Sequence, residues 1–210
     1  MVENYEVLYN GLIKQINIVK KQEYNPDYVN QRYNQYGEKG HQISGLRLGY
    51  LIGVLGFVPK SILDVGYGNG DFLKLCQNTI SECFGNDVSG YSIPDNVKFT
   101  DNIFDRHYEV ISMFDVLEHF EDIYFVKDLK CDYFYISVPW CHNLSDDWFY
   151  NWKHRRPDEH LWHFNENSIK SFFDEMGFDL IVHSSLEDII RKPVDSNPNI
   201  LTCIFKKRTN

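Results

Sequence analysis

Three shortages in the sequence each exclude a class of protein. Its 210 residues hold 21 lysines and arginines against 30 aspartates and glutamates, a formal net charge of −9. Because binding to a phosphate backbone depends on clustered cations, we expect no nucleic-acid partner. No apolar run approaches the roughly 18 residues that a membrane-spanning helix needs, so we expect no membrane span. The start of the chain is acidic and polar and does not have the pattern of a secretory signal.

Cysteine is also sparse and shows no pairing pattern. The cysteines are odd in number, scattered and without C-x-x-C spacing, which predicts reduced thiols and a cytoplasmic location. Histidine and cysteine do gather late in the chain, at Cys141-His142 and in His160-Leu-Trp-His163. This spacing matches no standard zinc pattern, so we expect no metal site. The five cysteines are Cys76, Cys83, Cys131, Cys141 and Cys203.

Two phosphate-binding motifs are absent as well. No G-x-x-x-x-G-K-[ST] run exists, which excludes a P-loop. The apolar run Ile62–Val65 predicts a buried strand, and Gly66, Gly68 and Gly70 follow it before a helical pattern begins at Phe72. A dinucleotide fingerprint requires G-x-G-x-x-G, and here the third glycine comes one residue early. The spacing favours a nucleoside-bearing ligand without a pyrophosphate, although glycine turns also occur with no ligand.

An acidic residue marks the end of the next predicted strand. Asp87 lies 21 residues after Gly66, about where a carboxylate on a second strand meets ribose hydroxyls. A carboxylate accepts both hydroxyl protons and is therefore selective for an unphosphorylated ribose. The alternative interpretation is a solvated aspartate in a loop.

Four stretches in order along residues 63–178 together resemble the class I S-adenosylmethionine-dependent methyltransferases of the small-molecule type. The first resembles the family's glycine motif and the second its "fDvi…dvlEH" stretch. The third resembles its fifth strand, and the last resembles its later "hft…sl…ll…Gf" helix. The stretches are Leu63-Asp-Val-Gly-Tyr-Gly-Asn-Gly70, Tyr108-Glu-Val-Ile-Ser-Met-Phe-Asp-Val-Leu-Glu-His119, Tyr135-Ile-Ser-Val-Pro139 and His163-Phe-Asn-Glu-Asn-Ser-Ile-Lys-Ser-Phe-Phe-Asp-Glu-Met-Gly-Phe178.

The resemblance implies S-adenosylmethionine as cofactor and S-adenosylhomocysteine as product. Its contacts would come from the carboxyl ends of the strands, where ligands of open α/β sheets bind. The glycine turn would flank the methionine part and the ribose, and Asp87 would take the ribose hydroxyls. Residues after the second, third and fourth strands would meet the adenine and the sulfonium. The implied cofactor residues are Asp64, Gly66, Gly68, Gly70, Asp87, Val88, Asn102, Ile103, Phe114 and Asp115.

Methyl transfer requires alignment of acceptor, methyl and sulfur without water, and a hydroxyl acceptor also needs a base. His119 is the leading candidate, because it follows the end of the fourth strand and an imidazole accepts a proton near neutral pH. His160 and His163 are alternative candidates, and His163 also stands at the family's "hft" position. The alternative for His119 is a histidine that caps or packs a helix start.

The acceptor is expected to meet a long connection between Pro139 and Asn165, which holds all four tryptophans. A connection of this length with little helical pattern is typical of a lid or binding loop. Aromatic surfaces would hold a sugar ring or another flat acceptor, and the basic run Lys153-His-Arg-Arg156 would meet an anionic group. The alternative is a solvated loop with tryptophans packed on the core. The expected contacts are Trp140, Trp148, Trp152, Arg155 and Arg156.

The predicted fold is α/β: a Rossmann-like, doubly wound, seven-stranded sheet, mostly parallel with one antiparallel strand, plus an N-terminal helical extension. We divide the chain into this extension, residues 1–57, and a methyltransferase domain, residues 58–210. Helices are expected over 3–22 and 41–56, and then near 70–79, 118–128 and 165–176. Strands are expected near 61–65, 82–87, 97–100, 109–114, 132–138, 179–184 and 200–206.

The sequence therefore predicts methyl transfer to oxygen or nitrogen of a small-molecule or glycan-type acceptor. The alternative is a non-catalytic S-adenosylmethionine-binding protein or partner subunit. A nicotinamide-dependent reductase is disfavoured by the glycine spacing and by Asp71 at the dinucleotide position. Methylation of nucleic-acid amino groups is disfavoured because Phe114-Asp-Val-Leu117 stands where that type has [DNS]-P-P-[YF]. The sequence predicts neither the acceptor nor the oligomeric state.

Overall fold

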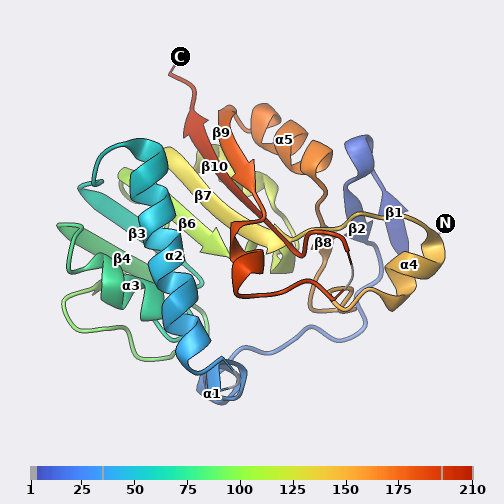
Figure 1. Ribbon diagram of the computed structural model, residues 1–210, viewed down its shortest axis with the longest axis horizontal. Helices are drawn as coiled ribbons and strands as arrows, with labels where there is room; N and C mark the ends of the chain where they lie inside the picture. The colour runs from blue at the N-terminus through green and yellow to red at the C-terminus, as the bar shows by residue number, and fades with distance from the viewer. Residues whose placement is uncertain (1–3, 35, 195, 210) are drawn as a thin grey trace.

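The computed structural model describes residues 4–34, 36–194 and 196–209, which form a central sheet with helices on both faces and a small second sheet at one end (Figure 1). The central sheet holds β3 (Ser61–Val65), β4 (Glu82–Asn86), β5 (Lys98–Phe99), β6 (Tyr108–Phe114), β7 (Cys131–Pro139), β9 (Phe178–Ser184) and β10 (Ile200–Lys207). The small sheet holds β1 (Tyr5–Val7), β2 (Ile13–Gln15) and β8 (Trp162–His163). The helices are α1 (Pro26–Asn34), α2 (Glu38–Leu55), α3 (Asp71–Cys76), α4 (Asp146–Asn151) and α5 (Glu166–Glu175), and the short 3₁₀ turns are η1 (Tyr9–Gly11), η2 (Leu117–His119), η3 (Tyr124–Asp128) and η4 (Leu186–Ile189).

The central sheet has the predicted topology. Its strand order is β5-β4-β3-β6-β7-β10-β9. The pairs from β5 to β7 are parallel, while β10 runs antiparallel to both of its neighbours. Among its described residues, the connection from β9 to β10 contains η4 alone, which is too short to cross over the sheet, so the chain returns as a hairpin. The predicted seven-stranded sheet with one antiparallel strand is confirmed.

Side chains alternate between two buried clusters, one on each face of the sheet. On β6, Val110 and Phe114 join a cluster with α2 and α3, whereas Ile111 and Met113 join a larger cluster with α5. Such alternation is the two-residue period of a strand covered by helices on both faces. The predicted helices over 41–56, 70–79 and 165–176 are present as α2, α3 and α5.

The helix expected over 3–22 is wrong, because the described part of this range forms the β1–β2 hairpin instead. Asn10 and Gly11 in its loop have φ of 52° and 79°, a left-handed conformation that a right-handed helix cannot contain. Asn-Gly is a strong hairpin signal, which the helical spacing of the apolar residues obscured. The hairpin and α4 lie together at one end of the molecule, and β4 and α3 lie at the other (Figure 1).

Two further segments differ from expectation. The helix predicted near 118–128 is two 3₁₀ turns, η2 and η3. The chain is extended between them at Phe120, whose carbonyl accepts a hydrogen bond from Trp162 Nε1 at 2.8 Å. The connection from Pro139 to Asn165 is also more ordered than predicted, because it contains α4 and β8.

Among the described residues, no helix is both long enough and apolar enough to cross a membrane.

The hairpin is part of the core and not an appendage, because Leu12 is fully buried in the cluster that contains α5. We therefore expect Leu12→Ala to lower the free energy of unfolding by roughly 2–4 kcal/mol, through lost transfer energy and the cavity left behind. Val19→Ala, at a side chain that is 89% exposed, is the matched control and should change it by less than about 0.5 kcal/mol. Denaturant unfolding measures both. Equal effects would show that the hairpin does not support the fold.

Candidate functional site

A cavity of about 350 Å³ lies outside the carboxyl ends of β3, β4 and β6. Its floor comes from the segments that follow these strands, and α1 and α2 supply other walls. This is the position at which open α/β sheets bind ligands, because the chain leaves neighbouring strands there in opposite directions. The structure therefore places most of the predicted cofactor residues in one cavity: Asp64, Gly66, Gly68, Asp87, Val88, Phe114 and Asp115.

The glycine turn after β3 is tightly enclosed. Gly66 has a φ of 73°, and a Cβ on it would lie 2.4 Å from a methyl group of Val116. Gly68 has a φ of 57°, and a Cβ there would collide with the hydroxyl and ring of Tyr33 from α1. Only glycine fits at both positions. Gly70 also has a positive φ but packs against Pro94 and does not line the cavity.

Asp64 is a buried carboxyl at the end of β3. It is 3% exposed and accepts a hydrogen bond from the hydroxyl of Ser112 at 2.7 Å. Burial raises its pKa to about 7, against the opposing effects of Ser112 and Arg47. The side chain can therefore exchange a proton near neutral pH, and it can pair with a cationic ligand group once it is ionised.

Asp87 holds the end of β4 to the glycine turn. Its Oδ2 accepts the N–H of Gly68 at 2.8 Å, and its Oδ1 accepts the N–H of Ser89 at 2.7 Å. Each carboxylate oxygen has a second acceptor position. Asp87 can therefore accept two further hydrogen bonds from ligand hydroxyls while it keeps the turn in place. Val88 beside it is 81% exposed and offers an apolar surface at the rim of the cavity.

A buried network of four charges closes one side of the cavity. Asp115 has a left-handed φ of 55° and accepts two bonds from Arg191, at 2.6 and 3.1 Å. Glu187 accepts two bonds from Arg47, at 2.7 and 3.0 Å, and a third from Arg191 at 2.9 Å. Although burial opposes it, Arg191 and Arg47 hold the pKa of Asp115 well below its usual range. The Arg47 guanidinium also lies 4.0 Å from the centre of the Phe114 ring.

Sequence reasoning found Asp115 but missed its three charged partners. The one available signal was the position of Arg47, four residues after Ile43 and four before Leu51, both of which α2 buries. An arginine at that spacing lies on the buried face and needs a buried acid. Nothing in the sequence indicated that the acid would come from the distant turn η4.

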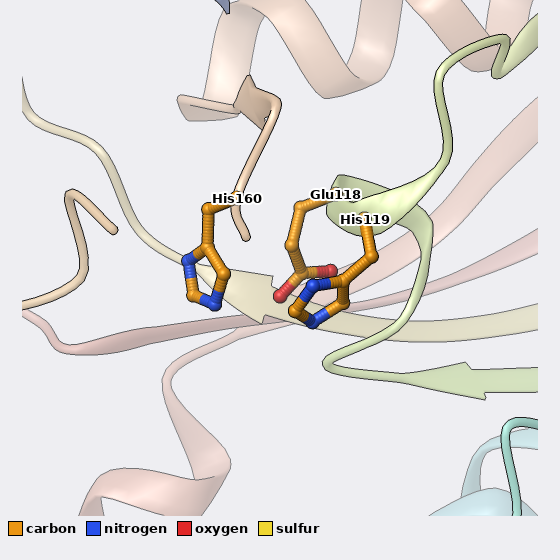
Figure 2. Close-up of side chains that lie close together, drawn as sticks. All are labelled: Glu118, His119 and His160. Atoms are coloured by element: carbon orange, nitrogen blue, oxygen red, sulfur yellow. The ribbon is translucent and has the colours of Figure 1, made fainter. Parts of the chain in front are cut away.

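Three further side chains gather at another wall, around η2. Glu118 and His119 lie on η2, and His160 comes from the segment before β8; their ligand-type atoms all lie within 4.8 Å of one another (Figure 2). The rings of His119 and His160 are perpendicular, with centroids 4.8 Å apart. His119 and His160 both line the cavity. Burial lowers the pKa of both imidazoles, so both are neutral at pH 7.

The second predicted base, His163, lies away from the cavity. It is 2% exposed on β8, and its ring packs among Tyr5, Phe149 and Trp152. Burial lowers its pKa to about 3. The structure therefore separates the two candidate bases: His119 lines the cavity and His163 is enclosed by aromatic rings.

Two predicted adenine contacts also lie outside the cavity lining. The Asn102 side chain accepts the N–H of Phe104 at 3.0 Å and bonds to Asp105, so it stabilises its own loop. Ile103 packs against the α5-side core cluster. The lining instead includes Asn86 and Ser89, which flank Asp87.

The residues expected to contact an acceptor are spread over a neighbouring region. Trp148 and Trp152 stack at 5.4 Å and line a separate cavity of about 350 Å³, together with His142. Trp140 stacks on the His142 ring at 5.5 Å. Arg155 lies over the rings of Tyr5 and Tyr150, and Arg156 bonds Glu159, a residue of the main cavity wall.

The main cavity has a different aromatic wall, which sequence reasoning did not identify. Tyr24, Tyr28, Tyr33 and Tyr36 line it, from α1 and the segments on either side. The Tyr24 hydroxyl lies 2.9 Å from Nδ1 of His119, and the Tyr28 hydroxyl donates to Glu159 at 3.2 Å. The signal that could have identified this wall is the high density of tyrosine in the otherwise polar segment 24–36.

Comparisons with known proteins agree with this geometry. A family model described as a methyltransferase domain matches residues 31–183. No curated protein matches the chain significantly. Solved structures share the fold. An S-adenosylmethionine-dependent methyltransferase from Clostridium acetobutylicum has a TM-score of 0.60 at 12% identity, over 87% of this chain and 99% of that one.

Two other similar structures contain bound S-adenosylhomocysteine. One is the 1,6-didemethyltoxoflavin-N1-methyltransferase of Burkholderia thailandensis, with a TM-score of 0.57 at 12% identity, over 98% of this chain and 100% of that one. The other is the plantazolicin methyltransferase BpumL, with a TM-score of 0.58 at 13% identity, over 87% and 91%. The matched family model covers well over half of the chain, including the glycine turn, β4, β6 and η2. The chain therefore belongs to the methyltransferase-domain family and is a class I S-adenosylmethionine-dependent methyltransferase.

Proposed function

We propose that this enzyme transfers the methyl group to an oxygen or nitrogen atom of a small-molecule or glycan-type acceptor. One observation carries the proposal: a single cavity joins two ends of different chemistry. Asp64 and Asp87 lie at the glycine turn, while His119 and His160 lie at η2. The first end suits a cationic nucleoside, and the second suits a group that must lose a proton. Both methyl-transfer partners therefore have a place within one enclosed space.

The residues at the glycine turn fit S-adenosylmethionine. Asp64 is placed to pair with the ammonium of the methionine part, and Asp87 has acceptor positions left for two ribose hydroxyls. Val88 offers an apolar rim for the adenine, and Phe114 and Asp115 border the centre of the cavity. When bound, S-adenosylmethionine supplies a methyl group on a positively charged sulfur, whose loss yields S-adenosylhomocysteine. The cavity volume lies in the usual range of small-molecule sites.

The chain's own contribution is positioning and activation of the acceptor. The tyrosines of the N-terminal segment line the cavity, so they offer aromatic surfaces to a flat acceptor. Nδ1 of His119 lies 2.8 Å from the carbonyl oxygen of Glu159 and donates its proton to it. The lone pair is then on Nε2, where it is available to the acceptor's proton or to a Lewis acid. We assign acceptor activation to His119 in preference to His163.

The acceptor contacts predicted at Trp140, Trp148, Trp152, Arg155 and Arg156 stay a proposal, and the second cavity beside Trp148 is where they would act. An anionic acceptor also has cations nearer to the main cavity, since Lys21 and Arg32 line it. We place the enzyme in the cytoplasm. All five cysteines are buried free thiols, which suits a reducing compartment.

The test is calorimetry with S-adenosylmethionine, S-adenosylhomocysteine and NAD, followed by a screen of acceptors for release of S-adenosylhomocysteine. Binding of the first two ligands together with turnover of a small hydroxyl or amine acceptor supports the proposal. Binding without turnover of any acceptor favours the alternative, a non-catalytic partner subunit. Binding of NAD alone contradicts the cofactor assignment.

Asp87 provides a direct test of the ribose contact. Asp87→Ala removes the acceptor for two ribose hydroxyls, so we expect binding of S-adenosylhomocysteine to weaken by roughly 1.5–3 kcal/mol, about 10- to 150-fold. Asp105→Ala, an acidic loop residue outside the cavity lining, is the matched control and should bind as the wild type does. Isothermal titration calorimetry measures both. An unchanged affinity in Asp87→Ala would remove Asp87 from the ribose site.

Asp64 gives the binding a pH dependence. With a pKa of about 7, the carboxyl is protonated below neutral pH and must lose that proton to pair with the ligand's ammonium. We therefore expect the affinity for S-adenosylhomocysteine to rise with pH, by up to about tenfold per unit below pH 7, and to level off above it. In Asp64→Asn, we expect the rise of affinity below pH 7 to disappear, leaving only the pH dependence that comes from the ligand's own ionisable groups. Parallel pH profiles in the two proteins would show that Asp64 does not meet the ammonium.

His119 and His163 can be separated by matched substitutions. We expect His119→Asn to lower kcat at least about 100-fold for a hydroxyl acceptor, the scale of acid–base catalysis, with little change in binding of S-adenosylhomocysteine. His163→Asn lies outside the cavity, so its effect should appear mainly in thermal stability. Steady-state kinetics and thermal unfolding of both variants make the comparison. Turnover within a few-fold of wild type in His119→Asn would place acceptor activation elsewhere.

A further inference from the structure

Two buried side chains at η2 lack partners. Glu118 is 1% exposed, and neither of its carboxyl oxygens has a hydrogen-bond partner among the described residues. His160 is 4% exposed, and its Nδ1 has none either. Burying a polar group without a hydrogen bond costs on the order of 1–3 kcal/mol, and more for a charged group. The unpartnered carboxyl of Glu118 lies close to imidazole nitrogens of His119 and His160, so a ligand bound between the three side chains would satisfy it.

The backbone holds these side chains in one place. The N–H of Leu161 donates to the carbonyl of Glu118 at 2.7 Å, so the segment carrying His160 is fastened directly to η2. Figure 2 shows the three side chains directed toward a common point from these two segments. The cluster therefore comes from the fold and not from spacing along the sequence, which is why the zinc-spacing rule predicted no metal site.

The surroundings of His119 are those of a metal-binding imidazole. Its Nδ1 donates to the Glu159 carbonyl, and the Tyr24 hydroxyl lies beside the same nitrogen. Histidines that bind metals usually donate their other ring N–H to a carbonyl or carboxylate, which fixes the tautomer and the ring orientation.

We propose that Glu118, His119 and His160 bind one divalent transition-metal ion at the acceptor end of the cavity. Two imidazole nitrogens and one carboxylate form a donor set typical of Zn²⁺, Fe²⁺ or Mn²⁺, with positions left open for other ligands. Ligand atoms around one such ion stand about 3–3.5 Å apart, at metal–ligand distances near 2.1 Å. The separations in the structure reach 4.8 Å, so the three side chains must draw closer together to bind the ion.

The role of this ion in catalysis rests on the proposed function. His119 and His160 line the cavity, so the open positions face the acceptor. A divalent cation lowers the pKa of a bound hydroxyl, so an acceptor hydroxyl held there would release its proton to water more readily. The oxygen then forms the new bond to the methyl carbon, and the electron pair of the broken carbon–sulfur bond stays on sulfur. His119 thus activates the acceptor as a ligand and not as the final proton acceptor.

Cobalt(II) titration of the chelator-treated protein tests the proposal, with visible absorption reporting coordination and calorimetry reporting stoichiometry. We expect one ion per chain, and an affinity at least about 10-fold lower in Glu118→Gln and in His160→Asn. His107→Asn, at a side chain that is 55% exposed, is the control for adventitious surface binding and should bind as the wild type does. Circular dichroism shows that each variant is folded.

Three results overturn the metal site: no stoichiometric binding by the wild type, equal binding by wild type, Glu118→Gln and His160→Asn, or loss of binding in His107→Asn. The first needs no variant, so it decides the question even where a substitution unfolds the protein. Calorimetry with S-adenosylhomocysteine is run on the same samples. Cofactor binding with turnover but without a metal site overturns this inference alone, whereas a metal site without cofactor binding overturns the proposed function and leaves the ion site standing.

Discussion

The cavity depends on the buried ion network that joins Arg47, Asp115, Glu187 and Arg191. These residues come from α2, from the end of β6 and from the region of η4, three segments far apart in the chain. The two cations and two anions balance in charge. The Arg47–Glu187 and Arg191–Asp115 pairs are both bidentate, the geometry in which arginine binds carboxylate most strongly. Removing one member would leave an uncompensated buried charge, which costs about 3–5 kcal/mol. The network thus fixes the N-terminal and C-terminal parts of the chain around one side of the cavity.

The carboxyls of the site divide into two kinds. Asp115 and Glu187 are each paired with arginine, and despite burial their pKa values lie below the usual range. Asp64 and Glu118 are both buried and form no ion pair among the described residues, and burial raises both pKa values. The first pair is satisfied by the fold itself. In the second pair, Asp64 accepts a hydrogen bond from Ser112, whereas neither carboxyl oxygen of Glu118 has a partner among the described residues.

The parts of the fold that follow local periodicity were predictable. The seven strands of the central sheet and its single antiparallel strand follow from apolar runs that alternate with helical patterns, and the glycine turn marked the cofactor end through its spacing. The prediction of a helix over 3–22 failed because two local signals compete there. Tyr5, Leu8 and Leu12 have helical spacing, but Asn10-Gly11 prefers a left-handed turn, and pairing of β2 with β8 decides in favour of the hairpin. The spacing of apolar residues along the chain gives no information about the pairing of β2 with β8.

The site was predictable to the same extent. Residues that follow strands were found because strand ends share one edge of the sheet, and seven of the ten predicted cofactor residues line the cavity. Asn102 was misplaced because its side chain serves its own turn, as asparagine often does in loops. The partners of Asp115 and His119 come from loops late in the chain. They are Arg191, Glu159 and His160. Their placement depends on long-range contacts that no local pattern encodes.

The division between these two ends has a physical consequence for specificity. The cofactor end is built from strand termini and a glycine turn, whose backbone geometry leaves little freedom to vary. The acceptor end is built from tyrosines of α1 and its flanking segments and from the connection that carries His160, all outside the central sheet. Side chains there can change without disturbing the sheet, since they bury no strand. We therefore propose that recognition of the acceptor comes from the elements that depart most from the common fold, above all the tyrosine wall and the Glu118–His119–His160 cluster.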